Sequence, residues 1–276
     1  MISAMPDNDL QASALSYARL MWMRWRLEGD PGLALVDELV HEGDAVVDAG
    51  AERGIFTLRM AQLAGPKGQV HAFEPYPESV ECLREIARAE AGVEVHPVAL
   101  SDRAGTARLY VPVEDGDAIS AVGSLVRPPE GDCETVDVET ARLDDALGDA
   151  AGRVSFVKCD VEGHELIVLR GAERVLTEGR PSLLVEIERR HAGERMEETF
   201  EYLAGLGYEG FAVRAEGPAP LAEFDVERDQ LAFLRDEFET GTMPAGYVND
   251  FYFRPAASSP SPPSAPATDS RAAASE

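Results

Sequence analysis

An apolar run followed by two closely spaced glycines, within residues 44–54, most constrains what this chain can fold into. Residues 45–47 are apolar but too few for a helix, and they suit a buried parallel strand. Asp48 ends this strand, Gly50 and Gly54 interrupt the pattern, and apolar residues then resume at helical spacing. A strand, a glycine turn and a helix in this order predict the start of a βαβ unit, whose turn lets a ligand approach the backbone at a helix N-terminus.

Glu74 follows the second expected strand, residues 69–73. A carboxylate in this position can accept hydrogen bonds from both hydroxyls of a ribose. A glycine turn of this kind is common by itself, and the acid downstream makes the pattern more specific. The two features together favour a ribose-containing ligand.

Strands and helices alternate along most of the remaining sequence, which predicts a doubly wound, mostly parallel sheet. A helix is expected from residue 163 to about residue 176. The strands expected after the first two are residues 93–98, 106–113, 135–138, 154–160, 181–188, 210–214 and 247–254. The last two of these are expected to pair antiparallel at the sheet edge. The segment 114–134, rich in Gly, Pro and acidic residues, is expected to form a long binding loop.

Three segments of different character divide the chain. Residues 1–40 are expected to form a helical segment that packs on the core, residues 41–254 the α/β domain, and residues 255–276 a disordered tail rich in Ala, Ser and Pro. The first helix, expected over residues 10–27 and ended by Pro31-Gly32, is apolar over most of its circumference. It either packs on the body of the domain or serves as a lid or a dimer contact.

The formal net charge of −26 argues against whole classes of partner. A protein that binds nucleic acid or an anionic membrane surface needs a basic face, and acidic residues here outnumber basic ones 51 to 25. Only Lys67 and Lys158 are lysines. This composition suits a protein dissolved in concentrated salt, where charge repulsion is screened, and it is equally consistent with drift in a GC-rich genome.

The three cysteines, Cys82, Cys133 and Cys159, are odd in number, widely spaced and without a CxxC pair. They are expected to be reduced thiols rather than disulfides or zinc ligands. No apolar run approaches membrane-spanning length, and the polar, acidic residues 7–9 are unlike the start of a signal peptide. A cytoplasmic location is therefore expected.

Polar side chains recur where the expected parallel strands end, which is the edge at which such sheets bind ligands. They are Asp48, Glu74, Ser101, Asp102, Asp160 and Glu186. Because side chains alternate along a strand, Lys158 and Asp160 share one face, as do Glu186 and Glu188. An ammonium inside a parallel sheet is costly unless it is paired, so neighbouring strands would bring a Lys-Asp-Glu cluster to the mouth of the pocket. A purely structural ion pair is the alternative.

Eight short blocks, in order along the chain, resemble the FkbM family of S-adenosylmethionine-dependent methyltransferases. The resemblance covers about residues 40–190, and residues 249–253 also resemble the last strand of that family. The blocks are 43–51, 55–57, 70–75, 99–102, 142–145, 156–165, 169–172 and 181–186, of which the longest reads FVKCDVEGHE.

The resemblance implies a class I methyltransferase fold, a Rossmann-like sheet of seven strands in which the last is inserted antiparallel near the edge. It also implies S-adenosylmethionine as the cofactor and O-methylation of a hydroxyl on a sugar, glycan or natural-product acceptor. By position, the implied cofactor contacts are Asp48, Gly50, Glu52, Gly54, Glu74, Ser101 and Asp102. Glu74 would bind the ribose, the last two would lie near the adenine, and the block around Asp160 would face the methyl group.

Glu52 departs from the family pattern, which usually reads Gly-Ala-Asn where this chain has Gly50-Ala51-Glu52. Its carboxylate could pair with the ammonium of the cofactor or repel the cofactor's carboxylate. Repulsion would leave a catalytically inactive cofactor-binding or scaffold module as the alternative function. A nicotinamide dehydrogenase would share the first βαβ unit, but the run from Gly50 to Gly54 lacks its Gly-x-Gly-x-x-Gly pattern.

Methyl transfer to a hydroxyl needs a group that accepts the proton, while the enzyme aligns the reactants. Asp160 is the first candidate for this role, with Lys158 beside it in the catalytic set. Glu186 and His191 are the other candidates for the base. His191 follows the fifth core strand, and a solvated surface histidine is the alternative interpretation there.

A divalent cation held by Asp160, Glu162 and Glu186 could instead acidify the hydroxyl. Sites made of oxygen ligands have no short spacing signature, so the sequence gives no specific support for this hypothesis, and no metal is expected. The histidines at positions 41, 71 and 96 are expected to be structural.

Overall fold

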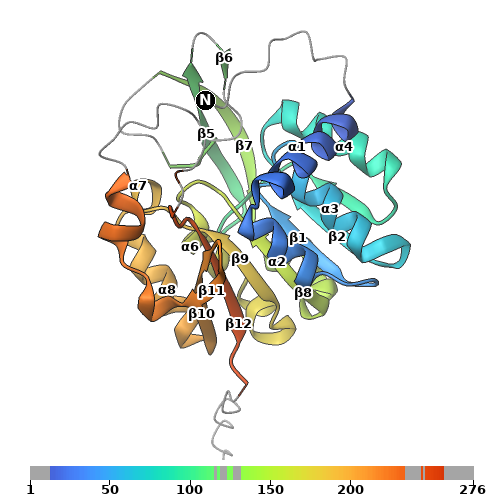
Figure 1. The fold of residues 1–276 in the computed structure, drawn as a ribbon. Coiled ribbons are helices and arrows are strands. Elements are labelled where there is room, and N and C mark those ends of the chain that lie inside the picture. Colours follow the sequence, from blue (N-terminus) through green and yellow to red (C-terminus); the bar gives the residue numbers. More distant parts are fainter. Residues whose placement is uncertain are drawn as a thin grey trace, which may run out of the picture.

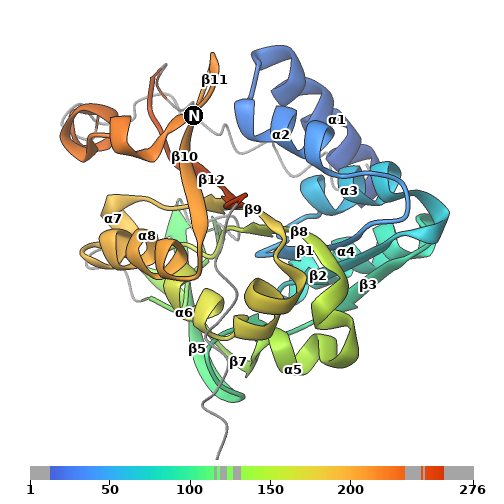
Figure 2. The same ribbon diagram turned by 90° about the horizontal axis from the view of Figure 1, so that it is seen from below.

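The computed structural model describes residues 13–114, 117–118, 123–126, 132–233, 244 and 246–257. The start of the first predicted helix, most of the predicted binding loop and residues 258–276 of the predicted disordered tail lie outside these residues. Within them, a mixed sheet of eight strands is covered by helices on both faces (Figures 1 and 2). Helices α1 to α4 lie on one face, and α5, α6 and α8 lie on the other.

The large sheet has the order β11-β10-β12-β9-β8-β1-β2-β3. Its strands are β1 (Ala45–Ala49), β2 (Gln69–Phe73), β3 (Val93–His96), β8 (Val154–Cys159), β9 (Ser182–Glu186), β10 (Tyr208–Arg214), β11 (Gly217–Pro220) and β12 (Asp250–Pro255). Strands β1, β2, β3, β8 and β9 are parallel, and β12 lies antiparallel between β9 and β10. This order confirms the predicted class I methyltransferase fold.

The sheet has eight strands rather than the seven that were expected. The additional strand, β11, folds back on β10 as an antiparallel hairpin. Gly217, with φ +114°, occupies a backbone conformation at this turn that other residues rarely adopt. β11 therefore forms the edge of the sheet, outside the two strands that were predicted to close it.

A second, smaller sheet follows β3 in the chain and has the order β4-β7-β5-β6. It contains β4 (Ala99–Leu100), β5 (Gly105–Glu114), β6 (Asp117–Ala118) and β7 (Cys133–Ala141). β5 and β7 pair antiparallel from Gly105↔Thr140 to Pro112↔Cys133 (Figure 1). β7 is longer than the predicted strand at 135–138, and the predicted loop is largely the connection between these two strands.

The N-terminal helices α1 (Ala14–Glu28) and α2 (Pro31–Leu39) are separated by Gly29. Gly29 ends α1 in the left-handed conformation, and the Asp30 side chain caps α2 by accepting from the Leu33 N–H. The prediction that Pro31 ends the first helix was therefore wrong, because Pro31 occupies the first turn of the second one, where its missing N–H does no harm.

α1 packs on α3 (Ile55–Ala64) and α4 (Pro77–Ala89). Ala18 is buried in this contact with Ile55, Leu58 and Ile86. Leu20 and Met23 of α1 are 52% and 60% exposed. The described part of α1 thus packs on the body of the domain. A role of α1 as a lid or a dimer contact stays a prediction.

Four further α-helices follow, α5 (Leu143–Leu147), α6 (Glu165–Arg170), α7 (Arg189–Ala192) and α8 (Arg195–Gly205). The single helix predicted from residue 163 to about 176 is interrupted after α6. Gly171 lies so close to the Ser101 carbonyl that a Cβ there would be 2.1 Å from its oxygen. A π-helix, Val175–Gly179, then follows.

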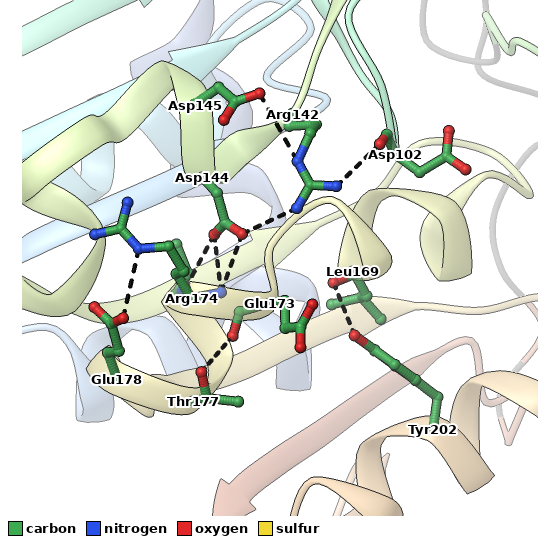
Figure 3. Close-up of polar contacts among 11 residues, drawn as sticks. Asp102, Arg142, Asp144, Asp145, Leu169, Glu173, Arg174, Thr177, Glu178 and Tyr202 are labelled. Carbon is green, nitrogen blue, oxygen red and sulfur yellow. Dashed lines mark hydrogen bonds and ion pairs between the residues drawn. The ribbon is translucent and has the colours of Figure 1, made fainter.

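The buried carboxylate of Asp144 holds this interruption in place (Figure 3). It accepts hydrogen bonds from the backbone N–H groups of Arg174 and Val175, and from Arg142 Nη2. Arg142 also donates to the Asp102 carbonyl. The conspicuous 142–145 block therefore joins α5, the π-helix and the loop after β4.

Core residues alternate between the two faces of the sheet. Val47, Ala49 and Phe73 belong to the cluster beneath α5, α6 and α8, whereas Val46 and Val70 belong to the cluster beneath α2 and α3. This alternation leaves the carboxyl ends of the parallel strands as the edge where polar residues gather. Among the described helices, none has the length and apolar character that crossing a bilayer requires.

Candidate active site

A pocket lies at the carboxyl edge of the large sheet, where β1, β2 and β8 end. Its polar lining comes from Glu52, Glu74, Asp160, Glu162 and His164, and Gly50 contributes backbone. Leu109 of β5, together with Gly123 and Leu125 from the segment between β5 and β7, lines another side. The structure therefore brings the glycine turn, the acid after β2 and the residues after β8 to a single cavity.

Gly50 allows the turn to approach the end of β8 closely. Its φ is +78°, and a Cβ there would be 1.7 Å from the carbonyl oxygen of Asp160. Gly54 has φ +83°, but a Cβ on it would meet Ile86 Cδ1 at 2.4 Å. The two glycines thus serve different contacts: Gly50 lies against the end of β8 in the pocket, and Gly54 lies against α4.

Glu52 occupies the left-handed region between these glycines, with φ +46°. Asparagine adopts this conformation more readily than glutamate, and this preference explains why asparagine suits the third position of the family's Gly-Ala-Asn. Burial raises the pKa of Glu52, and its carboxylate lies 3.5 Å from Arg53 Nε. Arg53 thus partly neutralises the charge of the Glu52 carboxylate.

Glu74 is 7% exposed and each of its oxygens accepts one backbone hydrogen bond. Oε2 accepts from Glu52 N–H at 2.9 Å and Oε1 from Tyr76 N–H at 2.7 Å. Burial raises the pKa of this carboxyl to about 7. A carboxylate oxygen can accept more than one hydrogen bond, so Glu74 both holds the turn and retains acceptor capacity toward the pocket.

Lys158 lies between two carboxylates. It pairs in register with Asp48 across β8 and β1, its Nζ lies 3.0 Å from Asp160 Oδ2, and it lies over the Phe56 ring at 4.5 Å. Burial alone would lower its pKa, but Asp160 and Asp48 raise it above its ordinary value. The ammonium is therefore charged and compensated, as the sequence predicted for a lysine in this position.

Asp48 is fully buried, and Thr57 donates to its Oδ2 at 2.6 Å. Its other oxygen, Oδ1, has no hydrogen-bond partner within the described part of the chain. Burial raises the pKa of Asp48, and the neighbouring Lys158 opposes that shift. Asp48 thus holds the start of α3 through Thr57, and its Oδ1 can still accept a hydrogen bond.

Glu186 and Asp250 extend the acidic cluster onto β9 and β12. The two residues are register partners, and Asn249 Nδ2 donates to Glu186 Oε1 at 2.9 Å. Burial, followed by the nearby Asp160, raises the pKa of Glu186 well above its ordinary value. Burial, followed by Asp30, raises the pKa of Asp250 to about 7. Asp250 was not among the predicted site residues. Its position, an acidic residue between Asn249 and an apolar strand, could have indicated it.

Glu162 and His191 form a contact that the sequence did not indicate. Glu162 Oε2 contacts His191 Nδ1, and Glu162 has the left-handed φ of +53°. A Cβ on the following Gly163 would lie 2.7 Å from the His191 carbonyl, so the two segments pack directly on each other. Burial would lower the pKa of His191, but the Glu162 carboxylate raises it above 6.5. Such a dyad can hold a proton near neutral pH.

Ser101 and Asp102 lie apart from the other predicted contacts. Ser101 Oγ is 3.2 Å from His164 Nε2, and His164 lines the pocket. Burial lowers the pKa of His164 to about 4, so its ring is neutral at pH 7. Asp102 is absent from the described residues that line the cavity. Ser101 thus reaches the pocket through His164, and the adenine-side contacts stay a prediction.

Glu162, Glu188 and His191 offer ligand atoms within 4.8 Å of one another. Each already has a protein partner, because Glu188 pairs with Arg190 and accepts from the Tyr247 hydroxyl. Among the groups that the structure describes, the set Asp160, Glu162 and Glu186 is not gathered to such distances. The charges of Glu162 and Glu188 are therefore met by groups of the chain itself.

These residues fit S-adenosylmethionine. The glycine turn brings the backbone of Gly50 to the pocket, Glu74 can accept from ribose hydroxyls, and the acidic cluster offers partners for positive charge. The Glu52 side chain lies at the same turn, paired with Arg53.

Comparison with known proteins gives consistent results. The model of a family described as "Methyltransferase FkbM domain" matches residues 48–209. The methyltransferase sdnD of Sordaria araneosa is 29% identical over 223 residues, which cover 70% of this chain and 78% of that protein. The 2-O-methyltransferase NoeI of Sinorhizobium fredii (strain NBRC 101917 / NGR234) is 31% identical over 157 residues, which cover 53% of this chain and 64% of NoeI.

A crystal structure of methyltransferase FkbM from Methylobacillus flagellatus KT is similar with a TM-score of 0.49 and 17% identity. The match covers 86% of this chain and 53% of that one. This chain therefore spans less than two thirds of NoeI and about half of the solved structure's chain.

Proposed function

The chain belongs to the FkbM methyltransferase family and is a methyltransferase, and we propose that it transfers the methyl group of S-adenosylmethionine to a hydroxyl of a sugar, glycan or natural-product acceptor. The observation that carries the proposal is the single pocket that contains the Gly50 turn, Glu74, Asp160 and Glu162. Of the predicted catalytic residues, Asp160 lines this pocket together with the predicted cofactor contacts Gly50, Glu52 and Glu74, whereas Lys158, Glu186 and His191 are absent from its described lining. The name of the relative NoeI, a 2-O-methyltransferase, supports oxygen as the acceptor atom.

When bound, S-adenosylmethionine supplies an electrophilic methyl group on a positively charged sulfur. In the proposal, Glu74 accepts hydrogen bonds from the ribose hydroxyls, and the backbone at Gly50 lines the cofactor side of the pocket. Lys158 lies beside the carboxylates of Asp48 and Asp160 and offsets part of their combined charge.

The acceptor side of the pocket is rich in hydrogen-bond acceptors. Asp160 and Glu162 line the cavity, and the half-buried Glu186 and Asp250 are register partners on β9 and β12. Carboxylates bind hydroxyl donors, and several of them together suit a polyhydroxylated acceptor such as a sugar. The acceptor's proton passes to His191 or Asp160, and Glu162 stabilises the imidazolium if His191 takes it.

A cofactor-binding module without catalysis is the second candidate, and Glu52 is the observation that favours it. Its carboxylate replaces a neutral amide at the turn, yet Arg53 lies 3.5 Å from it. We expect the arginine to compensate this charge and S-adenosylmethionine to bind.

The test is a methyl-transfer screen with labelled S-adenosylmethionine against sugars, nucleotide sugars and polyketide alcohols, preceded by calorimetry with S-adenosylmethionine and NADH. Binding of S-adenosylmethionine together with labelled ether products supports the proposal. Binding without transfer across the whole screen, or products labelled on nitrogen or carbon, would contradict it. Binding of neither ligand would favour a scaffold.

A further inference from the structure

Two histidines and a glutamate meet at the β3 edge of the large sheet, outside the proposed active site. His71 lies on β2, and Glu94 and His96 lie on β3. In the parallel register His71 is the partner of Glu94, and Phe73 is the partner of His96. Because side chains alternate along each strand, all four of these side chains project from the same face of the sheet.

The three polar side chains converge on one point. His71 Nδ1 is 3.2 Å from His96 Nε2 and 3.4 Å from Glu94 Oε2, and His96 Nε2 is 3.8 Å from Glu94 Oε1. A tetrahedral zinc ion with bonds of about 2.0–2.1 Å separates its ligand atoms by roughly 3.3–3.4 Å. The first two distances are close to this value. The third is longer and involves the other carboxylate oxygen, so Glu94 must shift to place a single oxygen with the two ring nitrogens around one ion.

We propose that His71, Glu94 and His96 form a binding site for one Zn²⁺ ion, which joins the edge strand β3 to β2. The proposal goes beyond the methyltransferase activity and does not depend on it. Two imidazoles and one carboxylate form a ligand set that suits zinc, whereas Mg²⁺ and Ca²⁺ prefer oxygen ligands alone. The Glu94 side chain is 63% exposed, and this leaves access for the ion and a coordination position for water.

A hydrogen bond between the two histidine rings is the simplest alternative for the 3.2 Å contact. It accounts for one pair of atoms only, and the two carboxylate distances of 3.4 and 3.8 Å are long for strong hydrogen bonds. Burial lowers the pKa of both imidazoles, with Glu94 opposing the shift, so both rings are neutral at pH 7, the form in which they bind metal.

The ring of Phe73 connects the proposed zinc site to the pocket. His96 stacks on Phe73 with ring centroids 4.3 Å apart, and Phe73 lines the pocket. The His96 carbonyl also accepts from the Glu74 N–H at 3.1 Å. An ion at His96 would therefore hold the wall of the pocket on which Glu74 lies.

Calorimetry of the untagged, chelator-treated chain with zinc chloride tests the proposal. Because the net charge of −26 attracts any cation, the titration contains excess Mg²⁺ and 0.5 M KCl. We expect one zinc per chain, a higher melting temperature with zinc than without it, and a Co²⁺ adduct with the visible absorption of a tetrahedral site. Glu94→Gln and His96→Gln should each weaken zinc binding by at least about tenfold, the lower end of what losing even an outer-shell partner costs.

Glu81→Gln is the matched control, because the Glu81 side chain is 65% exposed on the surface of α4. It should leave zinc binding unchanged. His191→Gln tests the other cluster that could hold an ion, at Glu162 and Glu188. The proposal is overturned if zinc binding survives Glu94→Gln and His96→Gln, if Mg²⁺ displaces it, or if only His191→Gln removes it.

Discussion

The carboxylate of Glu162 contacts Nδ1 of His191 across the segment that joins β8 to α6 and the turn that follows β9. The contact orients the ring through its Nδ1 atom. It also raises the pKa of His191, which suits a group that takes a proton near neutral pH. Glu162 thus positions His191, as Lys158 contacts Asp160 and Asn249 contacts Glu186.

His191→Asn should lower turnover by about 10²-fold or more, with little change in the dissociation constant of S-adenosylmethionine, as expected for a general base. Glu162→Gln should move the acidic limb of the pH–rate profile to lower pH, because the carboxylate that raises the His191 pKa is gone. Steady-state rates from pH 5.5 to 9 measure both effects. If both variants keep the wild-type profile, Asp160 becomes the first candidate for the base, and Asp160→Asn should lower turnover by about 10²-fold or more.

Glu74→Gln should weaken S-adenosylmethionine binding by about tenfold or more, since charge-assisted hydrogen bonds contribute roughly 1.5–3 kcal/mol. Glutamine keeps one acceptor oxygen and leaves one of the N–H groups of Glu52 and Tyr76 without its acceptor, whereas alanine would orphan both. Because the pKa of Glu74 is about 7, wild-type binding should tighten as pH rises from 6 to 8. Calorimetry at several pH values should show this slope only in the wild type.

The stability of the folded chain should fall as pH rises from 5 to 7.5. Burial raises the pKa values of Glu74 and Glu165 from 4.5 to about 7, so the folded state binds protons that the unfolded state releases. Their stabilising effect is complete below the unfolded value of 4.5 and is lost as pH passes through 7, on the order of 2–3 kcal/mol for each group.

Glu165→Gln isolates this effect from the rising negative charge of the whole protein. A glutamine oxygen can still accept from the Gly163 N–H, the bond that Glu165 Oε1 makes at 2.8 Å. Urea denaturation at constant ionic strength should therefore show a shallower pH dependence in the variant. An identical slope in the two proteins would mean that Glu165 titrates as it does in the unfolded chain.

Gly50→Ala should destabilise the chain far more than Gly43→Ala. Both glycines have positive φ, +78° and +90°, so alanine strains either backbone by about 1–2 kcal/mol. Around Gly43 no described atom lies within 4 Å of the added Cβ, whereas at Gly50 the Asp160 oxygen is 1.7 Å away. The difference between the two variants in urea should exceed roughly 2 kcal/mol. Equal values would show that the turn can move away from β8.

The melting temperature should rise between 0.1 and 2 M KCl, with most of the gain below 1 M. Acidic residues outnumber basic ones 51 to 25, and the Debye length falls from ~10 Å at 0.1 M to ~3 Å at 1 M. A non-ionic osmolyte separates charge screening from salting-out, because only the salt screens charge. A flat or falling melting temperature would indicate that the acid excess has no role in a saline environment.

The parallel strands could be predicted from the sequence because each is a short apolar run followed by a polar residue or a glycine, whereas the antiparallel strand near the edge was implied by the family resemblance. Periodicity placed Lys158 and Asp160 on one face, but the register that pairs Lys158 with Asp48 comes from the structure. What could not be predicted depends on where loops pass each other. The break after α6 arises from the approach of Gly171 to Ser101, and no local pattern encodes that contact.

The same limit applies to the candidate site. Glu162 and His191 are separated by a helix, a π-helix and a strand, so only the three-dimensional structure shows that they touch. His71 and His96 lie on different strands, and their convergence with Glu94 depends on the register of β2 with β3. Sequence reasoning found residues at strand ends and missed pairs made across elements.

The closeness of Gly50 to the Asp160 carbonyl has a consequence for engineering. The turn at Gly50 and the segment that begins at Asp160 pack directly against each other. The two segments therefore cannot be exchanged independently. A chimera that imports residues 160–163 from a relative must import a matching glycine turn with them. Crossover points are better placed at Gly148, whose Cβ position is open, than between β8 and α6. New acceptor specificity is then most safely selected in the β5–β7 connection, which borders the pocket without forming that contact.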